Sequence, residues 1–195
     1  MVRIIVLFCF LFACSFSGFS QENILLNTIV IDAGHGGKDP GALGKIAKEK
    51  DIVLNVALKF GNLIKENMPE VKVIYTRSSD VFVPLDKRAD IANKNNANLF
   101  VSIHANYVSS PKISGAETFV LGLHRSQDNL EVAKKENSVI VLEDNYISKY
   151  EGFDPSAAES YIVFELMQDR NLDQSIEVAS KMQSHFSTTA QRYNR

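Results

Sequence analysis

Short apolar runs alternate along the chain with longer stretches in which apolar residues return every three or four positions. The run at 27–32 is β-branched and leads into glycines, which predicts a buried strand. The stretch at 48–67 has helical spacing and is followed by Pro69. Its apolar positions are Ile52, Val56, Phe60, Leu63 and Ile64. A second helix is predicted at 85–96, facing inward through Leu85, Ala89, Ile91 and Ala92. Further strands are predicted at 71–76, 98–104 and 116–121.

This order of strand, helix, strand, helix and strand predicts an α/β domain. We expect a mixed, largely parallel sheet flanked by helices, with the functional loops at the carboxyl ends of its inner strands. Residues 127–190 are predicted to be mostly helical, and residues 143–156 to form a surface loop. No stretch has the composition of a linker to a second domain.

The N-terminal segment has a pattern of its own. Arg3 precedes an apolar run from Ile4 to Cys14, and small residues lead to a cleavage position before Gln21. This is the layout of a secretory signal peptide, and the run is shorter than the roughly 18–20 apolar residues of a membrane span. We therefore predict a signal peptide at 1–20, an exported protein of the periplasm or cell envelope, and no membrane span after its removal. A loose lipobox ending at Cys14 leaves a lipoprotein as the alternative.

Composition argues against several classes of protein. The 195 residues carry 21 Lys and Arg against 23 Asp and Glu, a formal net charge of −2, which argues against a nucleic-acid-binding protein. Both cysteines, Cys9 and Cys14, fall within the predicted signal peptide, so the mature chain would have no disulfide and no cysteine-based metal site. The glycine-rich loop at 33–44 lacks the spacing of a nucleotide-binding loop.

Two of the four histidines follow predicted strands. His35 lies in the glycine-rich loop after the first strand, and His104 ends the third. Glu49, at the start of the first helix, would lie at the same edge of the sheet. Two histidines, a glutamate and an open position form a common catalytic zinc site, in which the metal activates a water molecule. Taken singly, His35 could instead contact a phosphate, and His104 could be a buried core histidine.

Several further motifs occur in a specific order. They are D-x-G-H-G-G-x-D-P-G at 32–41, a glutamate before the first helix, T-R at 76–77, L-x-x-R-x-x-x-A at 85–92 and S-I-H-A-N at 102–106. From about Thr28 through Leu121 the chain closely resembles the zinc-dependent N-acetylmuramoyl-L-alanine amidases of bacterial cell-wall metabolism. The resemblance implies that His35, Glu49 and His104 bind Zn²⁺. It also implies that a zinc-activated water cleaves the amide between N-acetylmuramic acid and L-alanine of the stem peptide in peptidoglycan.

The resemblance extends to supporting residues. Asp39, Arg77 and Arg88 match family positions and are interpreted as structural. Asp39 would order the glycine-rich loop, and the arginines would hold the loops and the helix edge. A substrate contact by Arg77 is the alternative. His124 and His185 match no ligand position and are expected at the surface.

The chain departs from the family near its C-terminal end. The family's general base is a glutamate on a late strand, which we expect to lie beyond Arg195, and Glu165 matches that motif only superficially. Residues 21–195 are therefore expected to form the zinc amidase catalytic domain without its C-terminal strand, and this chain to be inactive by itself. The alternatives are a degenerate domain that binds peptidoglycan or regulates without cutting, and a different metallohydrolase such as a carboxypeptidase.

Residues 125–170 lengthen the connection after the fourth predicted strand. In some relatives a helix of such an insertion places a glutamate over the zinc until a partner protein removes it, which would add an activator protein to peptidoglycan as a partner. An ordinary pair of surface helices is the alternative. The candidate glutamates, among which the sequence does not select, are Glu131, Glu136, Glu143, Glu159 and Glu165.

Overall fold

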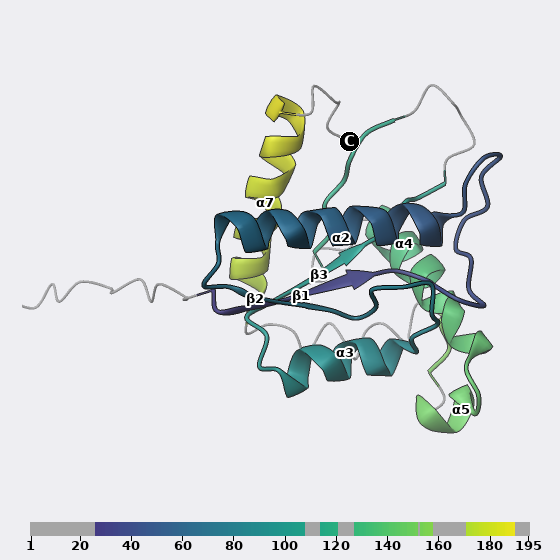
Figure 1. Ribbon diagram of the computed structural model, residues 1–195. Coiled ribbons are helices and arrows are strands. Elements are labelled where there is room, and N and C mark those ends of the chain that lie inside the picture. The colour runs from purple at the N-terminus through teal and green to yellow at the C-terminus, as the bar shows by residue number, and fades with distance from the viewer. Residues whose placement is uncertain (1–25, 108–113, 121–126, 152, 158–170, 190–195) are drawn as a thin grey trace, which may run out of the picture.

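The computed structural model describes residues 26–107, 114–120, 127–151, 153–157 and 171–189 (Figure 1). Its sheet has three parallel strands in the order β2-β1-β3, which are β1 (Thr28–Ala33), β2 (Lys72–Tyr75) and β3 (Leu99–Ile103). Helices α2 (Glu49–Asn67) and α3 (Leu85–Lys94) lie on opposite faces of the sheet. The predicted α/β architecture, with a parallel sheet flanked by helices, is confirmed. Each of these elements begins and ends within about two residues of its predicted bounds, the usual scatter of helix ends.

Strand β1 forms the centre of the described domain. All six of its residues are buried, because β2 and β3 flank it in the sheet and helices cover both faces. Val30 pairs with Ile74 of β2 on one side and with Phe100 of β3 on the other. Ala33 and Ile103 pair at the carboxyl ends of β1 and β3, so the loops that follow these two strands emerge side by side.

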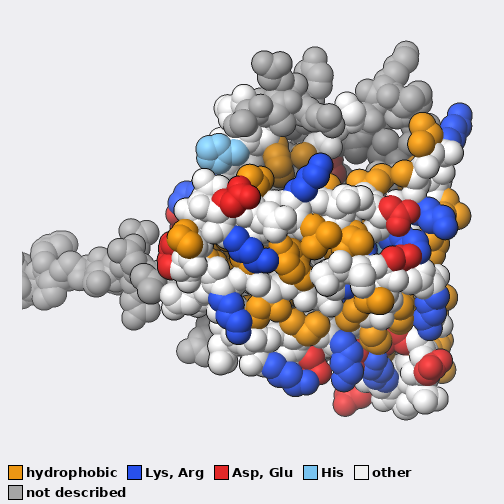
Figure 2. Space-filling model, in the orientation of Figure 1, with side chains coloured by type: hydrophobic (Ala, Val, Ile, Leu, Met, Phe, Trp, Pro, Cys, Tyr) orange, Lys and Arg blue, Asp and Glu red, His pale blue; other side chains and the backbone are white. Residues whose placement is uncertain are grey.

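Helix α2 packs against the sheet mainly through small residues and not through its bulkiest apolar residues. Its buried apolar positions are Val53, Ala57 and Gly61. Three larger apolar residues are much more exposed: Ile52 is 44% exposed, Val56 46% and Leu63 57%. Small residues let the helix approach the sheet closely, and a Cβ at Gly61 would collide with the hydroxyl of Tyr75. Phe60 and Ile64 still pack against the core. Figure 2 shows hydrophobic side chains interspersed with charged ones over the face of the molecule that it presents.

Helix α3 turns a charged residue toward the sheet. Arg88 is buried, and its Nη1 lies 2.7 Å from Oδ1 of Asp32. Ala89 is exposed, so its predicted inward position is wrong: the neighbouring residue takes the buried position because its guanidinium pairs with a buried carboxylate. The other predicted inward residues are half-buried: Leu85, Ile91 and Ala92.

The predicted strand at 116–121 is not a strand over its described part. Within 114–120, only Ala116 has a β-bridge partner. Its carbonyl accepts a hydrogen bond from Nε2 of Gln183 at 2.8 Å, and Oγ1 of Thr118 donates to Oε1 of the same glutamine at 3.0 Å. Gln183 belongs to α7 (Leu172–Thr189), so a helix side chain hydrogen-bonds to this stretch at both Ala116 and Thr118.

Three short elements lie beyond the carboxyl ends of the strands, namely α4 (Gln127–Asn137), the 3-10 helix η1 (Ser138–Leu142) and α5 (Tyr146–Lys149) (Figure 1). The stretch 143–156 is therefore not a plain surface loop: it contains α5, and Glu143 is buried. The predicted signal peptide, His124, Glu159 and Glu165 lie outside the described residues. None of the described helices combines the length and the apolar character needed to cross a membrane.

Candidate metal centre

Three of the predicted site residues come to one edge of the sheet because of where their elements begin and end. His35 is the second residue after β1, His104 directly follows β3, and Glu49 is the first residue of α2. Since β1 and β3 are adjacent and parallel, with Ala33 paired to Ile103, both histidines emerge at the same edge.

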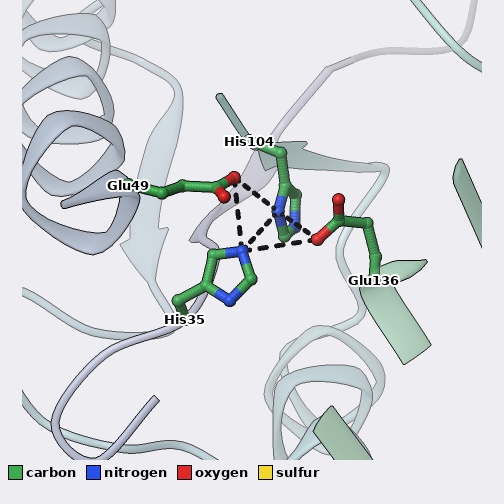
Figure 3. A group of neighbouring side chains, drawn as sticks. All are labelled: His35, Glu49, His104 and Glu136. Atoms are coloured by element: carbon green, nitrogen blue, oxygen red, sulfur yellow. Dashed lines mark hydrogen bonds and ion pairs between the residues drawn. The ribbon is translucent and has the colours of Figure 1, made fainter. Parts of the chain in front are cut away.

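A fourth side chain joins them to form a compact cluster (Figure 3). Glu136, on α4, reaches the two histidines from the side opposite Glu49. Oε1 of Glu49 lies 3.2 Å from Nε2 of His35 and 3.3 Å from Nδ1 of His104. Oε2 of Glu136 lies 3.3 Å from Nε2 of His35 and 2.8 Å from Nδ1 of His104. The two ring nitrogens are 3.1 Å apart, and all four donor atoms lie within 4.8 Å of one another.

These separations match the edges of a tetrahedron of metal ligands. Zinc bonds imidazole nitrogen and carboxylate oxygen at about 2.0–2.1 Å, which places neighbouring ligand atoms about 3.3 Å apart. Five of the six donor pairs in the cluster measure between 2.8 and 3.3 Å. Imidazole with carboxylate is also a donor set that zinc accepts. The residues present therefore fit a zinc ion.

The carboxylate of Glu136 is buried next to the two histidines. Neither of its oxygens meets hydrogen-bond geometry with a described residue, but Oε2 lies 2.8 Å from Nδ1 of His104 and 3.3 Å from Nε2 of His35, and the ammonium of Lys135 lies 3.6 Å from Oε1. A buried carboxylate needs a cation close by, which protonated imidazole supplies in the absence of a metal. A metal ion among the four donors would compensate the same charge.

The carboxylates make the cluster attractive to cations. Burial opposes a positive charge on His35, but contacts with three surrounding carboxylates outweigh it and raise its pKa to about 11. Burial also opposes the negative charge on Glu136, yet the two histidines lower its pKa to about 2. The pKa of Glu49 likewise lies well below its usual range, against the effect of burial, because of the histidines and two backbone N–H groups. The site therefore favours positive charge, from protons or from a metal ion.

Backbone contacts fix Glu49 and His104 in place. The side chain of Glu49 is 1% exposed, and its two oxygens accept hydrogen bonds from the N–H groups of Ala105 at 2.7 Å and Ala42 at 2.9 Å. A Cβ at Gly34 would overlap the ring of His104, so this position must be glycine for the ring to lie against the loop.

Asp39 orients the other histidine. Its Oδ2 lies 2.8 Å from Nδ1 of His35, which leaves Nε2 directed at the cluster. A carboxylate on the second ring nitrogen fixes the tautomer and direction of a metal-binding histidine. Asp39 also orders the loop as predicted, because its Oδ1 accepts the N–H of Gly41 at 3.1 Å. The contact with His35 was not predicted, although the spacing of four residues could have indicated it.

Of the three candidate glutamates that the structure describes, one lies at the cluster. Glu136 lies in the cluster, whereas Glu131 is exposed and Glu143 lies against the start of α3. His185 is exposed on α7, as expected. What sequence reasoning could not show is that α4 lies over the strand ends, because this depends on tertiary contacts and not on any local pattern.

An α/β sheet that gathers two histidines and a glutamate at the carboxyl ends of its strands has the form of a metal-dependent hydrolase. Residues 29–195 match the family described as Amidase_3, N-acetylmuramoyl-L-alanine amidase, and the chain belongs to this family. The family that the motifs predicted is thereby confirmed.

Individual relatives match shorter parts of the chain. The N-acetylmuramoyl-L-alanine amidase AmiC of Escherichia coli O6:H1 is 47% identical over 94 residues, which cover 48% of this chain and 22% of that protein. The amidase AmiA of Escherichia coli K12 is 31% identical over 155 residues, 78% of this chain and 51% of that protein. The catalytic domain of CwlV, an N-acetylmuramoyl-L-alanine amidase from Bacillus (Paenibacillus) polymyxa var. colistinus, is 40% identical, with 55% of this chain and 60% of that chain aligned at a TM-score of 0.45. The chain thus spans about half or less of the length of these two Escherichia coli relatives.

Proposed function

We propose that this chain carries the zinc site of an N-acetylmuramoyl-L-alanine amidase, which hydrolyses the amide between N-acetylmuramic acid and L-alanine in peptidoglycan. The ligands would be Nε2 of His35, Oε1 of Glu49 and Nδ1 of His104. The supporting observation is that these three atoms lie 3.1, 3.2 and 3.3 Å from one another in a member of the Amidase_3 family. Bound zinc would polarise the amide carbonyl and lower the pKa of water, which gives a nucleophile near neutral pH.

The chain's own residues prepare this site. With zinc bound, Asp39, whose Oδ2 lies 2.8 Å from Nδ1 of His35, would keep the proton on that nitrogen, so that Nε2 would present its lone pair to the metal. Two neutral imidazoles and the carboxylate of Glu49 together carry one negative charge. With a divalent cation the site retains a net positive charge, which favours the developing negative charge on an amide oxygen under attack.

Glu136 is proposed to block the site. Catalytic zinc sites have three protein ligands and one open position for water or substrate. Oε2 of Glu136 lies 2.8 Å from Nδ1 of His104 and 3.3 Å from Nε2 of His35, where such a position would be. Helix α4 would therefore have to move before hydrolysis, and a partner protein that displaces it would be an activator.

A second set of contacts holds the segment that carries α4 onto the domain. Oε1 of Glu143 accepts the N–H of Leu85, the first residue of α3, at 2.8 Å. Nζ of Lys149 lies 2.6 Å from Glu143 and 2.6 Å from Asp86. The hydroxyl of Tyr150 donates to Oε2 of Glu143 at 2.9 Å and accepts the N–H of Asp86 at 3.1 Å. We call these contacts among Glu143, Lys149, Tyr150, Leu85 and Asp86 the Glu143 clamp.

The reaction products test the proposal. The whole protein with Glu136→Ala, loaded with zinc, is incubated with purified peptidoglycan, and we expect free stem peptides beginning with L-alanine together with intact glycan strands. Release of single amino acids would indicate a carboxypeptidase. Binding without release would favour the non-catalytic alternative, which the four-donor cluster supports because structural zinc sites have four protein ligands. Glu131→Ala, at an exposed position on the same helix, is the matched control.

The site of action is proposed from the N-terminal pattern. Residues 1–20 would direct export, and residues 21–195 would belong to the catalytic domain in the periplasm or cell envelope. The naming of the relatives as amidases of N-acetylmuramoyl-L-alanine supports this, because their substrate lies outside the cytoplasm. Sequencing the N-terminus of the exported protein should give Gln21 first. A lipid-modified Cys14 would support the lipoprotein alternative instead.

A further inference from the structure

Three consecutive backbone carbonyls before the metal cluster point at two buried guanidinium groups. The carbonyl of Ala33 accepts hydrogen bonds from Nε of Arg77 at 2.9 Å and Nη1 of Arg88 at 2.8 Å. The carbonyl of Gly34 accepts from Nη2 of Arg77 at 2.7 Å. The carbonyl of His35 accepts from Nη2 of Arg88 at 2.8 Å. We call this arrangement the arginine cradle of Arg77 and Arg88.

Arg77 connects the backbone beside two of the candidate ligands, since Gly34 precedes His35 and Lys50 follows Glu49. The Nη2 that bonds Gly34 also donates to the carbonyl of Lys50 at 2.9 Å, and Lys50 follows Glu49 in α2. Its remaining hydrogen bond goes to the carbonyl of Ser79, at 3.1 Å. Among the described residues Arg77 has no salt bridge, although it is only 3% exposed. Burying a cation that is bonded only to carbonyls is unfavourable. The burial of Arg77 in the cradle therefore has to be offset by something it stabilises.

The feature that the cradle stabilises is the unfavourable backbone conformation of His35. Its φ is +60°, in the left-handed region that is unfavourable for a residue with a side chain. Gly36 follows with φ +122°, and a Cβ there would lie 2.9 Å from Nε of Arg77 and would overlap the carbonyl of Val81. The chain therefore turns sharply at the ligand itself, and the three carbonyls along this turn accept hydrogen bonds from the two guanidinium groups. The cradle supplies four such donor bonds.

We infer that Arg77 and Arg88 are positioning residues of the zinc site. They hold the carbonyls of residues 33–35, and through them the left-handed turn that directs Nε2 of His35 to within 3.2 Å of Glu49 and 3.1 Å of His104. Lysine keeps the charge but cannot present the planar fork of donors that bonds several carbonyls at once. The inference rests on the proposed zinc function, since its measured property is zinc affinity.

The test compares zinc affinities of folded variants of the full chain, by competition with a chelating dye. Arg77→Lys should weaken zinc binding by about 10- to 100-fold, as loss of a group that orients a ligand does. Cobalt loaded in place of zinc should show an altered d–d spectrum in this variant. Ser102→Ala is the matched control. It removes a 2.7 Å hydrogen bond to the buried Asp32, close to the cradle, but touches none of the three carbonyls.

A further variant separates positioning from folding. Arg88→Gln combined with Asp32→Asn removes both charges of the buried pair, which limits the loss of stability, yet still loses the donor to the His35 carbonyl. It should bind zinc at least tenfold more weakly than Ser102→Ala even at equal melting temperature. Zinc affinity that follows melting temperature alone across these variants, or that equals wild type in Arg77→Lys, would overturn the inference. Failure of the wild-type chain to bind zinc would instead contradict the proposed function.

Discussion

Replacing Glu143 by glutamine should release the proposed block of the zinc site without touching the site. Glu143 belongs to the segment that follows α4, and its side chain is 2% exposed against α3. One of its hydrogen bonds, from the N–H of Leu85, crosses from this segment to α3, whereas its contacts with Lys149 and Tyr150 lie within the segment. If the segment leaves α3 when Glu136 leaves the cluster, the substitution weakens the blocked state through the Leu85 contact, while the contacts within the segment change equally in both states.

The size of the effect follows from the contacts that are lost. The carboxylate accepts from the Leu85 N–H at 2.8 Å, the Tyr150 hydroxyl at 2.9 Å and Lys149 at 2.6 Å. Only the Leu85 contact crosses to the domain, and glutamine keeps an acceptor oxygen there but no charge, so the loss is about 1–2 kcal/mol, the difference between a hydrogen bond to a charged and to a neutral group. At about 1.4 kcal/mol for each factor of ten, the ratio of blocked to open protein should fall by about 5- to 30-fold.

Two rates report on the open fraction in the whole protein. Removal of zinc by an excess of chelator and release of stem peptides from peptidoglycan should both increase in Glu143→Gln, up to the level of Glu136→Ala. Glu131→Gln, at a glutamate that is 58% exposed on α4, should behave as wild type. The clamp would be refuted by rates that rise in Glu136→Ala and stay at wild-type values in Glu143→Gln. No rise in either variant would refute the block itself.

Three further outcomes are expected. Gly34→Ala should abolish zinc binding in calorimetric titration, because its Cβ would overlap the ring of His104; zinc affinity equal to wild type would contradict this. Ala57→Leu should lower the free energy of unfolding by about 1–3 kcal/mol in urea titrations, because Ala57 is fully buried against the sheet. Leu63→Ala, on the exposed side of the same helix, should change it by about 0.5 kcal/mol or less. Burial and a neighbouring carboxylate raise the pKa of Tyr150 to about 12, above the unfolded value of about 10. Its contribution to stability should be complete below pH 10 and disappear as pH rises toward 12, a loss that Tyr150→Phe should not show.

The three strands of the sheet and the two principal helices could be predicted because each depends on local pattern, whereas the predicted strand at 116–121 was wrong over its described part. Local pattern also placed three site residues at one edge of the sheet, and the family resemblance implied their role as ligands. Strand β1 is a β-branched, mostly apolar run that ends at the glycine-rich loop, and adjacent parallel strands bring His35 and His104 to one edge of the sheet. The placement of Glu49 at the same edge could be predicted because Glu49 is the first residue of α2. These inferences need the order of elements but no knowledge of distant contacts.

The remaining features depend on tertiary packing. The buried face of α2 does not follow from its large apolar residues, because close approach of helix and sheet favours Ala57 and Gly61 over larger neighbours. Arg88 takes a core position because Asp32 lies opposite it. Glu136 could not be singled out among five glutamates, since only the placement of α4 over the strand ends brings it to the histidines.

The most direct measurement is the anomalous difference map of crystals of the zinc-loaded protein, recorded on both sides of the zinc absorption edge. A single peak should lie about 2.0–2.1 Å from Nε2 of His35, Oε1 of Glu49 and Nδ1 of His104. In the blocked state Oε2 of Glu136 should be the fourth ligand. A map without a peak at this cluster, or with zinc bound elsewhere while these side chains keep their present contacts, would contradict the assignment of the site.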